Sequence, residues 1–213
     1  MLSVCEIFYS IQGESSYAGL PCAFVRLSGC NLSCAWCDTE YARGPGRDME
    51  VGEVVREVVA LRCPMVMVTG GEPLLQKETP DLLHALLRRE FKVLVETNGS
   101  LDIRLAPPAC SRIVDMKGPS SGMADKMNME NINHLEVGDE LKFVIADRTD
   151  YEHARRLVAL LDVENSRRHG VLFSPVFGVQ NPAELASWIL EDHLDARLNL
   201  QLHKVLWGDK RGV

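Results

Sequence analysis

The regular alternation of short apolar runs with helical patterns is the feature that most constrains the fold of this 213-residue chain. Runs typical of strands lie at 23–27, 65–69, 92–96, 112–115, 140–145, 171–174 and 198–202, and helical spacing lies at 50–61, 79–89, 150–161 and 182–190. Strands and helices in this order predict parallel strands joined by right-handed crossovers. The chain supplies about six or seven such units, whereas a closed eightfold barrel usually takes roughly 250 residues. We therefore expect an α/β fold, an incomplete and open β/α barrel that forms one domain over residues 1–213.

The segments that follow the predicted strands are polar and contain glycine, as at Gly70-Gly71 and Asn98-Gly99. In parallel α/β folds the carboxyl ends of the strands meet at one edge, and binding sites lie there. We therefore expect the functional residues of this chain to gather at that edge.

The composition excludes several classes of function. The chain has 23 Lys and Arg against 30 Asp and Glu, a net charge of −7, and this acidic balance argues against a surface that binds nucleic acid. Its apolar runs are short, whereas a membrane span needs about 20 apolar residues. The first ten residues lack the basic region and apolar run of a secretory signal. We therefore expect a cytoplasmic protein that binds neither nucleic acid nor membranes.

The grouping of the cysteines indicates a metal centre. Three of the seven, Cys30, Cys34 and Cys37, have the spacing C-x3-C-x2-C. Three thiolates in a tight loop can hold three irons of a 4Fe–4S cluster and leave the fourth iron open to a substrate or cofactor. Zinc is the main alternative, but a tetrahedral zinc site normally wants a fourth Cys or His nearby. The remaining cysteines are most simply buried small apolar residues: Cys5, Cys22, Cys63 and Cys110.

With Trp36 as its aromatic residue, the cysteine loop resembles the C-x3-C-x-(aromatic)-C signature of the radical S-adenosylmethionine enzymes. In that superfamily S-adenosylmethionine chelates the open iron, and one electron from the cluster cleaves it to methionine and a 5′-deoxyadenosyl radical. The segment TGGEP at 69–73 resembles the motif that contacts the methionyl amino group. The resemblance implies cofactor contacts at Gly70, Gly71, Glu72, Asn98, Lys117 and Ser174.

Further strings extend the resemblance from residue 6 to residue 204. They are EIFYSIQGE at 6–14, Arg26, CDT at 37–39, DMKGPSSG at 115–122 and QLHK at 201–204. Together they resemble the 7-carboxy-7-deazaguanine synthases, which are radical S-adenosylmethionine enzymes. The resemblance implies a lyase that contracts the ring of 6-carboxy-5,6,7,8-tetrahydropterin, releases ammonia and forms 7-carboxy-7-deazaguanine for queuosine and other 7-deazapurines. It also implies a 4Fe–4S cluster, Mg²⁺, a homodimer and an electron donor such as flavodoxin or ferredoxin.

The resemblance also assigns residues to the substrate and to the metal ion. A pterin edge alternates donors and acceptors, which amide, carboxylate and backbone groups can match, and Arg26 can grip the substrate carboxylate with two hydrogen bonds. Thr39 is expected to offer its hydroxyl to Mg²⁺, which prefers oxygen ligands. The expected substrate-binding residues, of which the last is also the candidate catalytic group, are Ile11, Gln12, Gly13, Glu14, Arg26, Thr69 and His203.

One residue departs from the family pattern. The family commonly has glycine after Gln-Gly-Glu, whereas Ser15 stands here. If the conformation of that glycine matters, the local turn must differ here, and the contact of Glu14 must differ with it.

Two other functions are alternatives to this interpretation. An activase of a glycyl-radical enzyme shares the cysteine loop and the GGEP string, but it does not need a segment that binds a pterin. A non-enzymatic electron-transfer or zinc-structured module would leave the GGEP string without a role.

Overall fold

Nine strands form one continuous sheet within residues 1–161 and 170–213, which the computed structural model describes. Their order is β3-β1-β2-β4-β5-β6-β7-β8-β9. From β2 onward the neighbours in this order are parallel, whereas β1 runs antiparallel to both β2 and β3. The strands span Leu2–Ile11 (β1), Pro21–Leu27 (β2), Arg47–Met49 (β3), Met65–Gly70 (β4), Lys92–Thr97 (β5), Ser111–Met116 (β6), Glu140–Ile145 (β7), Gly170–Pro175 (β8) and Arg197–Leu198 (β9). The sheet is open and mainly parallel, which confirms the expected incomplete barrel.

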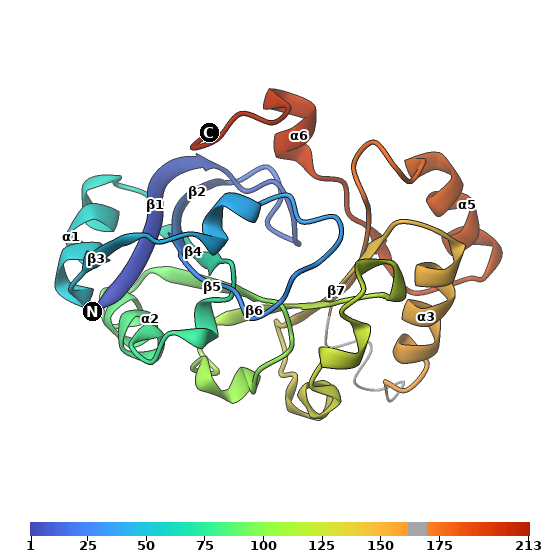
Figure 1. The fold of residues 1–213 in the computed structure, drawn as a ribbon, viewed down its shortest axis with the longest axis horizontal. Helices are drawn as coiled ribbons and strands as arrows, with labels where there is room; N and C mark the ends of the chain where they lie inside the picture. Colours follow the sequence, from blue (N-terminus) through green and yellow to red (C-terminus); the bar gives the residue numbers. More distant parts are fainter. Residues whose placement is uncertain (162–169) are drawn as a thin grey trace.

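Helices α1 and α2 cover the first half of the sheet, and α3 and α5 cover the second half (Figure 1). Val54 of α1 and Leu82 of α2 belong to one apolar core, and Tyr151 of α3 and Leu185 of α5 belong to another. Each large side chain buried in this way contributes about 1.5–3 kcal/mol to folding. The helices span Val51–Ala60 (α1), Thr79–Leu87 (α2), Arg148–Val158 (α3), Pro182–Glu191 (α5) and Leu202–Trp207 (α6).

The central strands are buried almost throughout, and their sequences therefore read as continuous runs. Every residue of β6 and all but one of β7 are buried, as is typical of parallel strands with both faces covered. Charged side chains such as Arg112 in β6 and Lys142 in β7 consequently need partners inside the protein.

The predicted strand at 198–202 is wrong beyond Leu198, because Leu202 begins the short helix α6. Tertiary hydrogen bonds explain the difference. The side-chain amide of Asn199 donates to Ser174 Oγ at 2.8 Å, and the backbone N–H of Leu202 donates to the carbonyl of Gly13 at 2.9 Å. The chain therefore leaves the sheet edge to join the loop after β1.

Two other boundaries differ from the sequence pattern. Strand β1 was not among the predicted runs, and it provides the antiparallel edge of the sheet. Helix α3 begins at Arg148, before the predicted start, because the Asp147 side chain accepts a hydrogen bond from the backbone N–H of Asp150 and caps the first turn. Within the described residues, no helix has the length and apolar character needed to cross a bilayer.

Candidate active site

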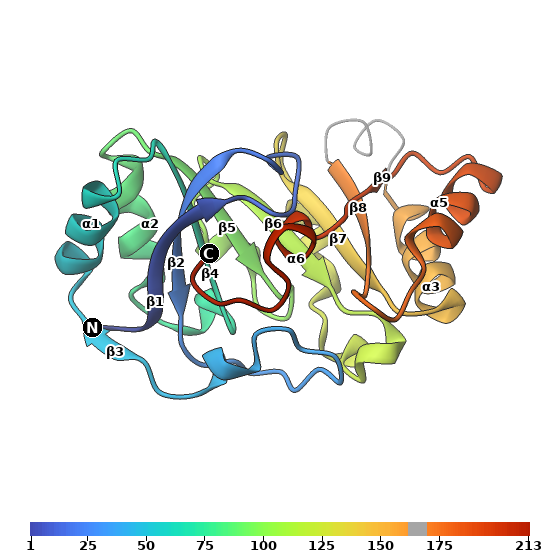
Figure 2. The same ribbon diagram turned by 90° about the horizontal axis from the view of Figure 1, so that it is seen from above.

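A cavity of about 660 Å³ lies at the carboxyl ends of the strands, and residues of β1 and of the C-terminal segment border it. Helix α6 and the C-terminal segment lie over the middle of the sheet (Figure 2). Most of the expected site residues share this wall: Ile11, Gln12, Gly13, Glu14, Arg26, Cys30, Cys34, Cys37, Thr39, Thr69, Gly70, Gly71, Asn98, Lys117 and His203. Glu72 and Ser174 are not part of it.

The three thiols of the cysteine loop line one cavity and offer ligands for an iron–sulfur cluster. All seven cysteines are free thiols. Sulfurs on one tetrahedral zinc ion would lie about 3.8 Å apart, given Zn–S bonds of about 2.3 Å. Among the described residues, only Glu14, Asp38 and His203 form a group of potential ligands whose atoms all lie within 4.8 Å of one another. The three thiols do not form such a compact group, and a loop of three thiolates is suited to three irons of a cubane.

The cysteine loop is anchored to the segment that follows β6. Trp36 Nε1 donates to Ser120 Oγ at 2.9 Å, and the Ser120 hydroxyl in turn donates to the carboxylate of Asp150 in α3. The ammonium of Lys117 lies over the Trp36 ring, 5.5 Å from its centroid, a cation–π contact. The loop is therefore held in place from a distant part of the chain before any cofactor binds.

The two glycines of the GGEP string allow the end of β4 to approach the cysteine loop closely. A Cβ at Gly71 would lie 2.2 Å from the carbonyl oxygen of Gly29 and 2.8 Å from Cys30 Cβ. Gly70 has a φ of 156°, and a Cβ there would lie 2.2 Å from the carbonyl of Leu27. Only glycine fits at these two positions without moving the backbone.

Glu72 lies behind the cavity wall, and its expected contact with the cofactor stays a prediction. It is fully buried, and its carboxylate accepts hydrogen bonds from Leu74 N at 2.9 Å, Thr97 Oγ1 at 2.9 Å and Asn98 N at 2.6 Å. Burial raises the pKa of Glu72 to about 7, and these hydrogen bonds oppose that rise. The residue therefore positions Asn98, which does line the cavity.

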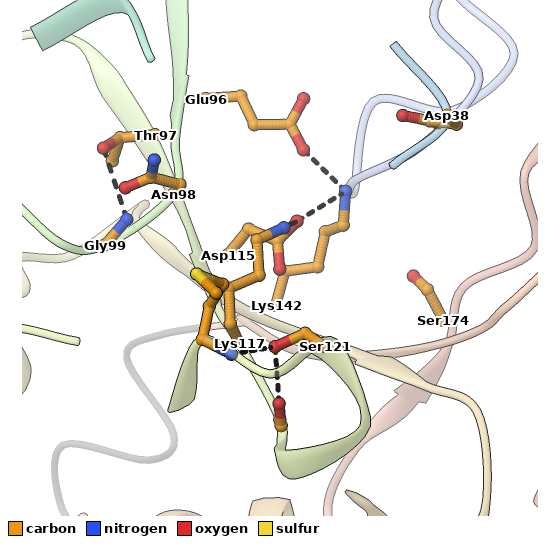
Figure 3. A network of polar contacts seen from close by, with 12 residues as sticks. Asp38, Glu96, Thr97, Asn98, Gly99, Asp115, Lys117, Ser121, Lys142 and Ser174 are labelled. Atoms are coloured by element: carbon orange, nitrogen blue, oxygen red, sulfur yellow. Dashed lines mark hydrogen bonds and ion pairs between the residues drawn. The ribbon is translucent and has the colours of Figure 1, made fainter. Parts of the chain in front are cut away.

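Ser174 also lies outside the cavity wall. It is buried, and its hydroxyl accepts the hydrogen bond from Asn199 that ends β9. Figure 3 shows it apart from the charged side chains at the centre of the site. Its observed contact explains the path of the chain after β9, and its expected contact with the cofactor stays a prediction.

The predicted pterin-binding segment meets the C-terminal helix. A Cβ at Gly13 would lie 2.1 Å from Nδ1 of His203, so glycine is needed for the imidazole to pack there. His203 lies in the first turn of α6 and not at a strand end as the sequence suggested. Burial lowers its pKa, and the imidazole is consequently held toward its neutral form.

Ser15 adopts a left-handed backbone conformation of the kind that glycine adopts most easily. Its φ is 67°, in the left-handed region, and its hydroxyl accepts a hydrogen bond from the backbone N–H of Tyr17 at 3.1 Å. Serine tolerates this strained conformation because its short polar side chain bonds locally. The serine thus adopts a backbone conformation that suits glycine, and Glu14 lies in the cavity wall.

Arg26 precedes the cysteine loop in the sequence and Thr39 follows it, and both residues line the cavity. Arg26 Nε donates to Glu6 Oε1 at 2.8 Å, which fixes the guanidinium in the wall. The Thr39 hydroxyl donates to Asp38 Oδ1 at 3.1 Å. Asp38, Glu14 and His203 place one potential ligand atom each within 4.8 Å of one another. Two carboxylates suited to a hard cation such as Mg²⁺ therefore lie close together beside Thr39.

A buried charged network at the centre of the site was not predicted. Lys142 Nζ lies 2.5 Å from Glu14 Oε2, 2.6 Å from Glu96 Oε1 and 3.6 Å from Asp115 Oδ2. Figure 3 shows Lys142 reaching toward Glu96 and Asp115, with Lys117 beside them. The lysine inside the apolar run 140–145 could have indicated this network. A charged side chain is rarely buried in a strand unless it pairs with another charged group.

Comparison with known proteins places the chain in a family. Residues 24–187 match the radical SAM superfamily. The 7-carboxy-7-deazaguanine synthase of Koribacter versatilis is 44% identical over the full length of both chains. That of Chlorobaculum tepidum is 46% identical over all of this chain and 97% of its own. The chain belongs to the 7-carboxy-7-deazaguanine synthase family.

The fold agrees with that of a solved structure. The crystal structure of QueE from Escherichia coli matches 95% of this chain and 94% of its own with a TM-score of 0.77, at 21% identity. Membership in the radical SAM superfamily implies a 4Fe–4S cluster and S-adenosylmethionine, and the cysteine loop fits this cluster. The glycyl-radical activase is not favoured, because relatives that match the whole chain are 7-carboxy-7-deazaguanine synthases.

Proposed function

We propose that this chain converts 6-carboxy-5,6,7,8-tetrahydropterin to 7-carboxy-7-deazaguanine with loss of ammonia, in the biosynthesis of queuosine and other 7-deazapurines. When bound, the cluster and S-adenosylmethionine supply the radical that takes a hydrogen atom from C6 of the substrate. One observation carries the proposal: a single cavity joins the three grouped cysteines, the glycines of the GGEP string and the polar segment 11–14. Its volume lies within the range of about 300–1,000 Å³ that is usual for small-molecule sites.

The protein's own groups can read the substrate edge. Gln12 is buried in the wall, and within the described residues its side-chain N–H₂ has no hydrogen-bond partner. Its Oε1 accepts from the backbone N–H of Glu14 at 3.2 Å, which fixes the amide with its donors free. An unmatched buried donor is unfavourable unless a ligand satisfies it. Gln12 thus fits as a donor to a pterin acceptor, and Glu14 fits as an acceptor for pterin N–H groups.

Arg26 is proposed to bind the substrate carboxylate. Glu6 holds its Nε, and a guanidinium fixed in this way can offer its terminal N–H groups with little loss of side-chain entropy. Thr69, at the end of β4, is buried in the same wall between the cysteine loop and the substrate segment. Its hydroxyl is proposed to contact the substrate next to the cofactor, and His203 is proposed to face the substrate from α6. Lys117 and the 70–71 backbone are proposed to hold the cofactor.

Mg²⁺ is proposed to bind at Thr39. We expect Thr39→Ala to keep the brown colour of the cluster and to weaken the stimulation of turnover by Mg²⁺, because only an oxygen ligand is removed. Ser33→Ala is the matched control, since Ser33 is an exposed hydroxyl residue of the same loop. The measurement is the initial rate as a function of Mg²⁺ concentration. Undiminished stimulation in Thr39→Ala would remove this residue from the metal site.

The assembly and location are also proposed. We infer one domain over residues 1–213, in keeping with the continuous sheet, and a homodimer, for which exposed apolar side chains such as Phe177 and Val205 offer surface. The reaction needs an electron donor such as flavodoxin or ferredoxin, and a thiolate-bound cluster suits the reducing cytoplasm. The substrate is a small molecule, and no contact with nucleic acid or membrane is proposed.

The decisive experiment is an anaerobic assay with reconstituted protein, reductant, S-adenosylmethionine, Mg²⁺ and the tetrahydropterin, followed by mass spectrometry of the products. We expect 7-carboxy-7-deazaguanine from the native protein. Cys34→Ala should abolish both the product and the brown colour, whereas Cys5→Ala should retain both, because Cys5 lies on β1 outside the cavity wall. Native protein with a complete cluster that forms no such product would disprove the proposal.

A further inference from the structure

Lys142 lies at the point where three separate parts of the cavity wall meet. It is in the middle of β7, its side chain is only 6% exposed, and it pairs in register with Asp115 of β6. Its ammonium contacts Glu14 from the loop after β1, Glu96 from β5 and Asp115 from β6. No part of the site assigned so far explains why a lysine is buried at this position.

The charge balance keeps this lysine protonated. Burial lowers the pKa of Lys142, but Glu14, Glu96 and Asp115 raise it well above its ordinary value. The ammonium group therefore acts as a fixed positive charge and does not transfer its proton at neutral pH. Including Lys117, which lies 2.8 Å from Asp115, the network has three carboxylates and two ammonium groups.

Glu14 is held from both sides. Lys142 contacts Oε2 at 2.5 Å, and Gln201 Nε2 donates to Oε1 at 2.9 Å. A carboxylate fixed in one orientation presents acceptor sites in a defined plane. Without the ammonium, Oε2 of Glu14 would lose its ion pair, and the carboxylate would be free to rotate out of this plane. A rotated carboxylate would present its acceptor sites away from the pterin N–H groups that need them.

We propose that Lys142 is a positioning residue for substrate recognition: through its ion pair with Glu14, it holds that carboxylate oriented toward the N–H donors of the pterin. The inference rests on the proposed function. Lys142 itself touches carboxylates of the protein and acts on the substrate through Glu14 alone.

The first test is Lys142→Met, which removes the ammonium and keeps an unbranched apolar stem. We expect KM for the tetrahydropterin to rise at least about tenfold, a change that corresponds to about 1.4 kcal/mol. The dissociation constant of 6-carboxypterin, a non-reacting analogue measured by fluorescence, should rise in parallel, with a smaller change in kcat. Iron content and substrate-free cleavage of S-adenosylmethionine should be unchanged. Lys92→Met is the matched control, because Lys92 begins β5 outside the cavity wall.

A second pair of variants tests whether Lys142 acts through Glu14. Glu14→Gln removes one carboxylate, and adding Lys142→Met removes one ammonium, so the double variant keeps the network at two carboxylates and one ammonium, the original net charge of −1. We expect the double variant and Glu14→Gln to bind 6-carboxypterin equally. A further loss of affinity in the double variant would overturn the inference, even if the single Lys142→Met chain did not fold.

The outcomes separate this inference from the proposed function. Native protein that forms no 7-carboxy-7-deazaguanine defeats the proposed function. Native protein that turns over, together with a folded Lys142→Met variant whose KM and 6-carboxypterin affinity are unchanged, defeats only the role of Lys142. A loss of cluster iron in Lys142→Met as large as its loss of 6-carboxypterin affinity would indicate a structural role. That result would likewise overturn the inference.

Discussion

Two groups of buried charges in the same sheet are built in opposite ways. Arg112 and Asp139 are each 2% exposed and form a closed pair, in which the backbone N–H and guanidinium of Arg112 both donate to one carboxylate. Nη2 of Arg112 also donates to the carbonyl of His134 at 2.9 Å. The network around Lys142, in contrast, has more carboxylates than ammonium groups and borders the cavity.

The difference separates charges that serve the fold from charges that serve a ligand. Within the described part of the chain, Asp115 Oδ1 and the side-chain nitrogen of Gln12 have no hydrogen-bond partner, and both residues line the cavity. A closed buried pair strongly destabilises the protein when one partner is removed. A network open to a cavity can be compensated by water or by protons, and its loss should appear mainly in binding.

The largest expected effect on stability tests this contrast directly. Arg112→Met leaves Asp139 buried without its partner, and we expect the free energy of unfolding to fall by about 3–5 kcal/mol. Lys142→Met should lower it by clearly less, because Glu14 and Glu96 are 15% and 26% exposed and can be solvated from the cavity. Urea denaturation of the two variants measures the difference. A loss in Lys142→Met as large as in Arg112→Met would contradict the comparison.

Glu72 sharpens the contrast, because it is a buried carboxylate whose partners are all neutral donors. Its pKa is raised to about 7 in the folded protein from an ordinary 4.5. The folded state therefore binds this proton more tightly than the unfolded state, and the stability from Glu72 is full below pH 4.5 and is lost as pH rises through about 7.

The expected size of that loss is about 3 kcal/mol, at 1.36 kcal/mol per unit of pKa. Glu72→Gln has no charge to lose, so the stability of the native protein relative to this variant should fall between about pH 4.5 and about pH 8. Urea denaturation of both proteins across this range measures it. A difference that stays constant with pH would show that Glu72 is ionised throughout.

The smallest effect concerns the turn that presents Glu14. Ser15→Ala removes the hydroxyl that accepts from Tyr17 N and keeps the left-handed backbone, so stability should fall by about 1 kcal/mol. Ser15→Gly loses the same hydrogen bond but relieves the strain, and we expect a change within about 0.5 kcal/mol. Thermal denaturation distinguishes the two. Equal losses in both variants would mean that the backbone at Ser15 is not strained.

The order of segments was enough to predict the open barrel and the place of its site. Runs such as 65–69 and 140–145 are continuous and apolar because both faces of those strands are covered. Crossover geometry then brings the carboxyl ends together. The three closely spaced cysteines predicted their own chemistry, because ligands within one loop need no distant contact to converge.

The tertiary structure decided which groups face the cavity. Sequence placed Glu72 and Ser174 among the cofactor contacts, yet their partners, Asn98 and Asn199, lie 26 and 25 residues away and turn them into the protein. The sequence analysis assigned no role to Lys142, whose partner Glu14 lies 128 residues earlier in the chain. Local pattern fixes where a strand begins and which residues are apolar, whereas the direction of a buried polar side chain depends on the partner that the folded chain brings to it.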